Sequence, residues 1–379
     1  MNRRGVWVVM VMSALMVLVC VPKAWGQRPA DVEPLRGTVE QKVVQAWDRA
    51  SIPGEIVLLP ARTVLGNDLD VTKHYRSLHL VCDSEHDSRN GRCLAAGNDE
   101  NGSGHSRVLL EFVEQRSGLT TAIDVVGYLQ RIESVNRCEP SFWSRYERPI
   151  WTRYGAVCGA SLQSGTGVAL SVPASSLEAL VAGRWTASLR LNLRSSIESF
   201  ATYIFNFDFT ITDHNAASIY FPQFESTTPL VNLDARYDPI QQTVGGRTVV
   251  DMCLYDGLGS QASYLAVTAR DISPRSAGNS GFSLWHDSSG SDPSQRLDYT
   301  VTLDHNGARV PLNNGVEEQL TGIDSSQLRL VMLPGMSQPV FCVNTPMTLD
   351  MPRVPSTSKR SGIYWGDLQL ELRVPAGTP

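Results

Sequence analysis

The chain has 379 residues, of which 42% are apolar and 19% are charged, so it can bury a core and is not compositionally disordered. Its length suggests about two domains, and its 30 glycines and 21 prolines favour many turns over long helices. The net charge of −5 argues against a nucleic-acid partner, because proteins that bind nucleic acids usually carry a basic surface.

The first 26 residues have the pattern of a cleaved secretory signal peptide. Arg3-Arg4 precedes an apolar run over residues 6–21, and Ala24-Trp25-Gly26 places small residues at the two positions that signal peptidase reads. The run falls short of the ~20 residues that span a bilayer, and it ends abruptly at Pro22, so a membrane anchor is the weaker alternative. We expect cleavage before Gln27 and export from the cytoplasm.

Cysteine is the most informative residue type of the mature chain. Removal of the leader leaves 353 residues, a net charge of −8, because three basic residues go with the leader, and six cysteines in an oxidising compartment. An even number there predicts three disulfides, and six cysteines allow fifteen arrangements. Pairing of sequence neighbours is the simplest of them: Cys82–Cys93, Cys138–Cys158 and Cys253–Cys342. A zinc site is less favoured, since no CxxC spacing occurs.

Helical signals are few. Residues 39–50 have some helical spacing through Val43, Val44 and Trp47, and the segment 175–181 is expected to form one or two turns.

Strict alternation of apolar and polar residues recurs and predicts strands with one buried and one solvated face. In chain order, the apolar positions are Leu189, Leu191 and Leu193; Phe205, Phe207, Phe209 and Ile211; Tyr299, Val301 and Leu303; Leu328, Leu330 and Met332; and Leu368, Leu370, Leu372 and Val374. Turn clusters at 97–102 and 287–293 separate such stretches. Many short strands separated by such turns are typical of antiparallel sandwiches, so we predict an all-β fold.

A domain boundary is expected after the strand that ends at Thr212. The next residues, 213–215, are polar and turn-prone, and a new apolar stretch begins at Ile219. This divides the mature chain into domains at 27–212 and 216–379 with a linker at 213–215. The Cys253–Cys342 bridge is then forced if bridges stay within domains.

The sequence contains no HExxH motif, no P-loop and no GxGxxG motif after a strand. Residues 278–281 resemble the loop around a serine-protease nucleophile, but none of the seven histidines stands in a recognisable catalytic motif, so a turn is favoured. A secreted hydrolase is the weakest of the alternatives. We expect no enzymatic activity, no metal and no cofactor.

One segment has the composition of a recognition surface. Between Cys138 and Cys158 stand Trp143, Arg145, Tyr146, Arg148 and Trp151. Aromatic faces stack on sugar rings, and arginine supplies paired donors for acidic groups. The alternative is that the aromatics fold back onto the sandwich as a satellite core, since large aromatic side chains are usually buried.

Several segments together resemble the CblD-like pilus initiator family, the minor tip subunits of class 5 fimbriae of the colonisation-factor-antigen type in Gram-negative enteric bacteria. The segments are Val250-Asp251-Met252-Cys253-Leu254-Tyr255-Asp256-Gly257, Met332-Leu333-Pro334, Gln338-Pro339-Val340-Phe341-Cys342, Gly362-Ile363-Tyr364-Trp365-Gly366, Ile219-Tyr220-Phe221-Pro222-Gln223-Phe224, Gly183-Arg184-Trp185 before Leu189-Arg190-Leu191-Asn192-Leu193, and the ten-residue loop between Cys82 and Cys93. The resemblance covers nearly the whole mature chain.

The resemblance implies two tandem immunoglobulin-like β-sandwich domains, an adhesin domain at 27–212 and a pilin domain at 216–379. The pilin domain of this family is an incomplete sandwich, completed by a donor strand first from a periplasmic chaperone and then from the next subunit, here the major pilin. An outer-membrane usher assembles the fibre. The resemblance thus implies a virulence-associated tip adhesin and pilus initiator of the chaperone–usher pathway, carried at the cell surface and binding a glycan or protein receptor of the host.

The receptor-binding arginines of the family are replaced in this chain. The family has one arginine just before the first cysteine and two adjacent arginines after the Leu-x-Leu-Asn strand. The matching positions here are Ser77, Ser195 and Ser196. Arg76 and Arg194 stand beside them, so we take Arg76, Arg194, Ser195 and Ser196 as receptor-binding candidates beside the aromatic segment. The alternative is a pilus initiator with no receptor binding of its own.

Overall fold

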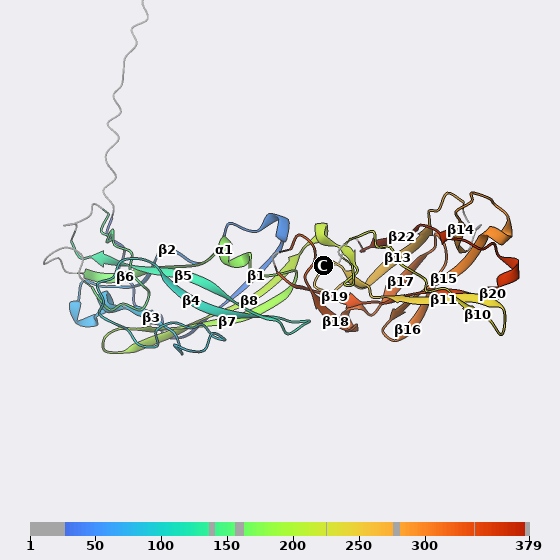
Figure 1. Ribbon diagram of the computed structural model, residues 1–379. Coiled ribbons are helices and arrows are strands. Elements are labelled where there is room, and N and C mark those ends of the chain that lie inside the picture. Colours follow the sequence, from blue (N-terminus) through green and yellow to red (C-terminus); the bar gives the residue numbers. More distant parts are fainter. Residues whose placement is uncertain are drawn as a thin grey trace, which may run out of the picture.

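The computed structural model describes residues 27–135, 141–155, 163–224, 226–275, 281–336 and 338–375, and these are almost entirely β-structure. Two β-rich domains lie end to end (Figure 1). The predicted leader lies outside the described residues. None of the helices in the described part of the chain has the length and apolar character that a membrane-crossing helix requires.

The first domain is built on one eight-stranded sheet. Its strands follow the order β1 (Gly37–Asp48), β8 (Ser199–Thr212), β7 (Gly183–Arg194), β4 (Ser106–Glu114), β5 (Thr120–Glu133), β6 (Gln163–Pro173) and β2 (Glu55–Asn67), and β3 (His79–Val81) pairs with the end of β7. The alternating residues of β7 and β8 point into the core as predicted. Phe205, Phe207 and Phe209 of β8 are buried, and Phe112 of β4 stacks on Phe209 with ring centroids 5.3 Å apart.

Within the segment 39–50, only the last two residues are helical, as part of a 3-10 turn at Arg49–Ser51, which corrects the sequence-based expectation. Over Gly37–Asp48 the chain forms strand β1, which pairs in parallel with the whole of β8. Val39, Val43 and Trp47 are four residues apart, and this spacing places side chains on one face of a strand as well as on one face of a helix. All three pack on the first core, so pairing with β8 decides between the two.

The only α-helix in the described residues is the single turn α1 (Ala174–Leu177), which overlaps the segment 175–181 expected to form one or two turns. The remaining helical elements are 3-10 turns: η1 (Arg49–Ser51), η2 (Val71–Lys73), η3 (Tyr75–Ser77), η4 (His214–Ala216), η5 (Pro293–Gln295), η6 (Ile323–Ser325) and η7 (Ser356–Ser358).

The second domain contains three sheets around its own core. The first has the order β10 (Arg236–Asp238), β11 (Thr243–Val250), β20 (Met347–Pro355), β15 (Arg296–His305), β14 (Phe282–His286) and β21 (Tyr364–Trp365), with β16 (Ala308–Leu312) beside β15. The second has the order β18 (Leu328–Val331), β19 (Val340–Asn344), β12 (Cys253–Tyr255) and β9 (Ser218–Tyr220). The third has the order β17 (Glu317–Thr321), β13 (Tyr264–Asp271) and β22 (Leu368–Arg373).

The predicted buried face of residues 328–332 is wrong by one residue. Leu330 and Met332 are half-exposed, whereas Val331 and Leu333 are buried. Val331 and Leu333 pack with Cys342 into the core of the first domain, because β18 and β19 lie at the junction. The neighbouring first domain, which no local sequence pattern records, therefore decides which face of this strand is buried.

The junction between the domains also contains polar contacts beside this apolar packing. The Glu114 carboxylate accepts the backbone N–H of Ser117 at 2.7 Å and lies 3.4 Å from the side-chain amide of Gln261, which belongs to the second domain. Arg116 donates across the junction to the carbonyl oxygens of Ile323 at 3.3 Å and Ser326 at 2.6 Å. These contacts hold the two domains end to end.

Candidate receptor-binding site

The structure brings the three serines of the predicted patch to one end of the first domain. Ser77 closes η3, and Ser195 and Ser196 lie in the turn between β7 and β8. The hydroxyl oxygens of Ser77 and Ser196 are 3.2 Å apart, and the Ser196 backbone N–H donates to Ser77 Oγ at 3.1 Å. Segments that are 119 residues apart in sequence thus meet at these serines.

Ser195 and Ser196 have different roles in this turn. The Ser195 hydroxyl oxygen is 3.2 Å from the backbone N–H groups of both Ile197 and Glu198, and the side chain is buried. Ser195 therefore shapes the turn, whereas Ser196 is exposed beside Arg194, which is also exposed. Of the two predicted serines, only Ser196 presents surface to a ligand.

Arg76 and Arg194 differ from other arginines at this end of the domain. Arg36 lies 3.5 Å from Glu198, and Arg153 lies 2.8 Å from Asp99. Within residues 27–135, 141–155 and 163–224, neither Arg76 nor Arg194 forms an ion pair. Their charges remain available to an acidic or hydroxyl-rich ligand.

His79 lies directly beneath this patch. It is buried in β3, where it pairs with Arg194 of β7, and its Nδ1 lies 2.8 Å from the carbonyl oxygen of Ser77. Burial lowers the pKa of the His79 imidazole to about 4, and the positive charges of Arg131, Arg153 and Arg194 act in the same direction. His79 is therefore neutral at physiological pH and donates Nδ1–H to Ser77.

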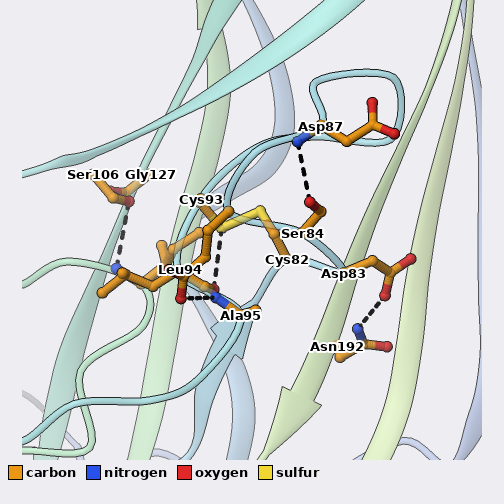
Figure 2. The surroundings of a disulfide bond; sticks show 12 residues. Cys82, Asp83, Ser84, Asp87, Cys93, Leu94, Ala95, Ser106, Gly127 and Asn192 are labelled. Atoms are coloured by element: carbon orange, nitrogen blue, oxygen red, sulfur yellow. Dashed lines mark hydrogen bonds between the residues drawn. A yellow bond between two sulfur atoms is a disulfide. The ribbon is translucent and has the colours of Figure 1, made fainter.

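The Cys82–Cys93 disulfide fixes the chain immediately after β3, with Cα atoms 5.3 Å apart. Figure 2 shows the bridge beside β7, where Asn192 donates to the carboxylate of Asp83 at 2.7 Å. The Asn90 carbonyl of the bridged loop accepts the Arg190 backbone N–H at 2.9 Å. The loop and β7 together make the end of the domain rigid. A second neighbour pairing, Cys253–Cys342, is also present as a disulfide, whereas Cys138–Cys158 lies outside the described residues.

Arg131 connects the serine patch to the aromatic segment, and the sequence analysis missed it. The side chain is fully buried, and its guanidinium donates to the carbonyl oxygens of Leu78, Thr152 and Tyr154 at 2.7, 2.6 and 3.1 Å and to Thr166 Oγ1 at 2.5 Å. Burial lowers the pKa of Arg131 to about 9. Alternation along β5 is the sequence signal that could have identified Arg131. Arg131 stands two residues after buried Leu129, so a charged side chain occupies a position that faces the core.

Part of the aromatic segment folds back onto the sheet. Trp143 is buried over Gly167 of β6, and the Arg62 guanidinium lies 5.5 Å from its ring centroid. Arg148 is buried and donates to Asn101 Oδ1 at 2.7 Å, and Trp151 packs on the first core. Trp143 and Arg148 pair with Ile132 and Leu129 on the edge of β5 that β4 leaves uncovered. With Trp151 on the core as well, the expectation that these three residues form a recognition surface is not supported.

Arg145 and Tyr146 form the exposed part of the segment. The Tyr146 side chain is 37% exposed, and the Arg145 guanidinium lies 4.8 Å from its ring centroid and donates to its hydroxyl at 2.7 Å. The tyrosine ring has few rotatable bonds, and the cation–π contact with arginine holds it in place, so it offers a preformed contact surface. The satellite-core interpretation therefore applies to the buried residues of the segment, and the recognition interpretation is left to Arg145 and Tyr146.

The second domain has a polar cleft of about 630 Å³, and none of the predicted receptor-binding residues lines it. Its walls are formed by Asp304, Asn306, Gly307, Ser325, Gln327, Asn344 and Pro346. The described residues contain no group of three or more acidic, histidine or cysteine side chains that could hold a metal ion.

Comparison with known proteins identifies relatives of both domains. Family models of the first and second domains of CfaE, a subunit of CFA/I fimbriae, match residues 23–214 and 217–376. The CFA/I fimbrial protein CfaE of Escherichia coli is 27% identical over 314 residues, which are 78% of this chain and 80% of that protein. A crystal structure described as CfaE, the adhesive subunit of CFA/I fimbria of enterotoxigenic Escherichia coli, superposes with a TM-score of 0.69 and 25% identity over 92% of this chain and 95% of that chain. A structure described as a chaperone–tip adhesin complex of CFA/I fimbriae has the same fold, with a TM-score of 0.66, 24% identity and coverage of 92% and 99%.

Proposed function

The chain belongs to the CfaE family of class 5 fimbrial tip adhesins, and we propose that it caps the fimbria, initiates its assembly and binds a host receptor. The first domain binds the receptor. The second domain accepts a donor strand from the major pilin, at the position that a periplasmic chaperone has occupied before. Export through the periplasm and delivery to an outer-membrane usher complete the pathway. The observation that carries the proposal is the incomplete edge of β22.

Strand β22 has one paired edge and one open edge. It pairs with β13, and within residues 226–275, 281–336 and 338–375 no strand pairs with its other edge. Leu368, Leu370 and Leu372 point toward the second core but are only partly buried. An added strand with alternating apolar side chains would cover this row and satisfy the open edge.

The N-terminal segment is already used by the first domain. Asn67 donates from its side-chain amide to the carbonyl oxygens of Pro29 at 2.7 Å and Ala30 at 3.0 Å, and Val32 pairs with the Asn67 backbone. A segment held in this way is not free to complete another subunit. This use of the segment supports a chain that accepts a strand without donating one, as a subunit at the end of a fibre would.

Fusion of the major pilin's N-terminal strand after the C-terminus tests the accepting role. The fused strand should raise the melting temperature of the second domain, because it buries the row of leucines on β22. A matched fusion whose apolar positions are replaced by serine should have no effect, and Leu370→Asp should abolish the gain. An unchanged melting temperature with the native strand would contradict the open-sandwich interpretation.

Adhesion assays test the receptor-binding role. Arg194→Ala, Arg76→Ala and Tyr146→Ala should each reduce binding of the fimbriated cell to host cells, whereas Arg107→Ala, an exposed arginine paired with Asp124, should not. The second candidate, an initiator without receptor binding, is favoured by the serines at positions 77, 195 and 196. Unchanged adhesion in all three variants, with normal fimbriation, would support this second candidate. Whether the receptor is a glycan or a protein is decided by adhesion after glycosidase treatment of the host cells.

A further inference from the structure

One family segment, Gly362–Gly366, contains exposed apolar side chains that donor-strand binding does not use. Ile363 is 70% exposed and Trp365 is 49% exposed. Tyr364 between them points inward, since its hydroxyl donates to the carbonyl oxygen of Arg360 at 2.6 Å and its ring meets the edge of His286 at 5.2 Å. Because side chains alternate along a strand, Ile363 and Trp365 share the outward face of β21.

Ile272 extends this surface from the neighbouring strand. Its backbone N–H donates to the carbonyl oxygen of Asp367 at 3.0 Å, which continues the β13–β22 ladder one step beyond the Asp271–Leu368 pair. Ile272 therefore lies opposite Asp367, at the end of the sheet where the chain leaves β21 and Trp365. Ile272 is 54% exposed. We refer to Ile272, Ile363 and Trp365 as the distal apolar patch.

The distal apolar patch lies at the end of the second domain that faces away from the first. Strand β13 begins at Tyr264, just after a loop in which Gly259 touches Gly183 of the first domain. Its other end, Asp271, pairs with the start of β22, whereas Arg373 at the end of β22 pairs back near the junction. In Figure 1 the strands β14 and β20 mark this far end of the molecule.

The position of the patch selects its occupant. A donor strand that pairs with the open edge of β22 must connect to the folded body of its own subunit at one end of that edge. The junction end is filled by the first domain, so that body has to stand at the far end, against the distal apolar patch. The outward positions that follow on β22, Gln369 and Glu371, are polar, so along this strand the exposed apolar side chains do not continue toward the junction.

We propose that the distal apolar patch is a docking surface for the folded body of the strand-donating pilin, with Trp365 as its central anchor. The inference rests on the proposed donor-strand function and adds a second contact to it. A large aromatic side chain flanked by aliphatic ones is the usual composition of an interface hot spot. The partner surface is correspondingly apolar, and it belongs to the part of the pilin outside its donor strand.

The test compares the whole major pilin with a synthetic peptide of its N-terminal strand, each binding to the full chain. Trp365→Ala combined with Ile363→Ser should weaken binding of the whole pilin about tenfold or more and leave peptide binding within about twofold. Ile363→Ser alone, at the more exposed position, should give a smaller loss of the same kind and guards against misfolding. Leu330→Ala, a control at a side chain that is 50% exposed near the junction, should change neither affinity. Leu370→Asp should abolish both.

Different failures point to different errors. Unchanged affinity for the whole pilin in the double variant, with peptide binding intact, overturns the docking surface and leaves the donor-strand function standing. An equal loss of affinity for the peptide and for the whole pilin also overturns it, because the patch would then affect binding of the donor strand to β22 and not docking of the folded body. Loss of chaperone binding without loss of pilin binding assigns the patch to the chaperone and overturns the proposal. If the wild-type chain binds neither probe, the proposed function and the docking surface fall together.

Discussion

Acid should destabilise the first domain through His79 before it affects the carboxylates. The folded-state pKa of His79 is lowered to about 4 from an ordinary value of 6.5, because protonation would place a charge inside the buried β3–β7 ladder next to three arginines. The unfolded chain therefore takes up the proton first as the pH falls, and stability is lost from about pH 6.5 downward. Each pKa unit corresponds to about 1.4 kcal/mol, so the full loss approaches ~3 kcal/mol, of which about 2 kcal/mol falls between pH 6.5 and 4.5.

The pH window separates this effect from that of the acidic residues. Carboxylates with a lowered pKa, such as Glu33 and Asp68, lose their stabilisation only below their ordinary values of 4.5 and 3.8. Urea unfolding at pH 7.5, 6.5, 5.5 and 4.5 measures the slope, and hydrogen exchange of peptides from β3 and β7 assigns it to the first domain. The matched control is His79→Asn, whose side-chain amide can still donate to the Ser77 carbonyl but cannot be protonated in this range. The reasoning is refuted if His79→Asn and the wild type lose stability equally between pH 6.5 and 4.5.

Three further predictions follow from buried or cross-domain contacts. Arg131→Met should cost about 3 kcal/mol or more in urea unfolding, because three buried carbonyl oxygens lose their donor, and a loss below about 1 kcal/mol would contradict the role of Arg131 as a buried link. Replacing Cys253 and Cys342 by serine opens a loop with a sequence separation of 89 and should cost the second domain ~4–5 kcal/mol by chain entropy. Hydrogen exchange should show the loss mainly in the second domain, and equal loss in the first would argue against it. Arg116→Ala removes two bonds across the junction and should separate the unfolding transitions of the two domains in calorimetry, whereas Arg107→Ala on β4 should leave them unchanged.

Local sequence patterns predicted most strands, because the alternation of apolar and polar residues shows which side chains of a strand face a core. The alternation over 205–211 became β8, with every apolar side chain buried, and the same holds for Leu189, Leu191 and Leu193 of β7. The pattern failed where a distant partner decides the outcome. The spacing of Val39, Val43 and Trp47 fits both a helix and a strand, and pairing with β8 selects the strand. The exposed face of β18 depends on the first domain lying against Val331 and Leu333.

The candidate site stays a prediction, and the sequence does not distinguish the roles of its residues. The family resemblance matched Ser77, Ser195 and Ser196 to arginine positions, and the structure brings the hydroxyl oxygens of Ser77 and Ser196 within 3.2 Å of each other. No pattern distinguishes exposed Tyr146 from buried Trp143, because both are aromatic residues of one irregular segment. The importance of Arg131 depends on carbonyl oxygens from three different segments, which only the folded chain brings within reach.

The long hairpin of β7 and β8 also determines how the molecule carries load. Its turn holds the serine patch at one end, and Asp213 at the other end is bonded to Gly257 of the second domain at 2.6 Å. A cell pulled away by flowing liquid would tension the molecule between these two ends, parallel to the strands. The tension then passes along the continuous backbone of β8, while β7 and β1 hold that strand extended on both sides and their hydrogen bonds to it lie outside the load path.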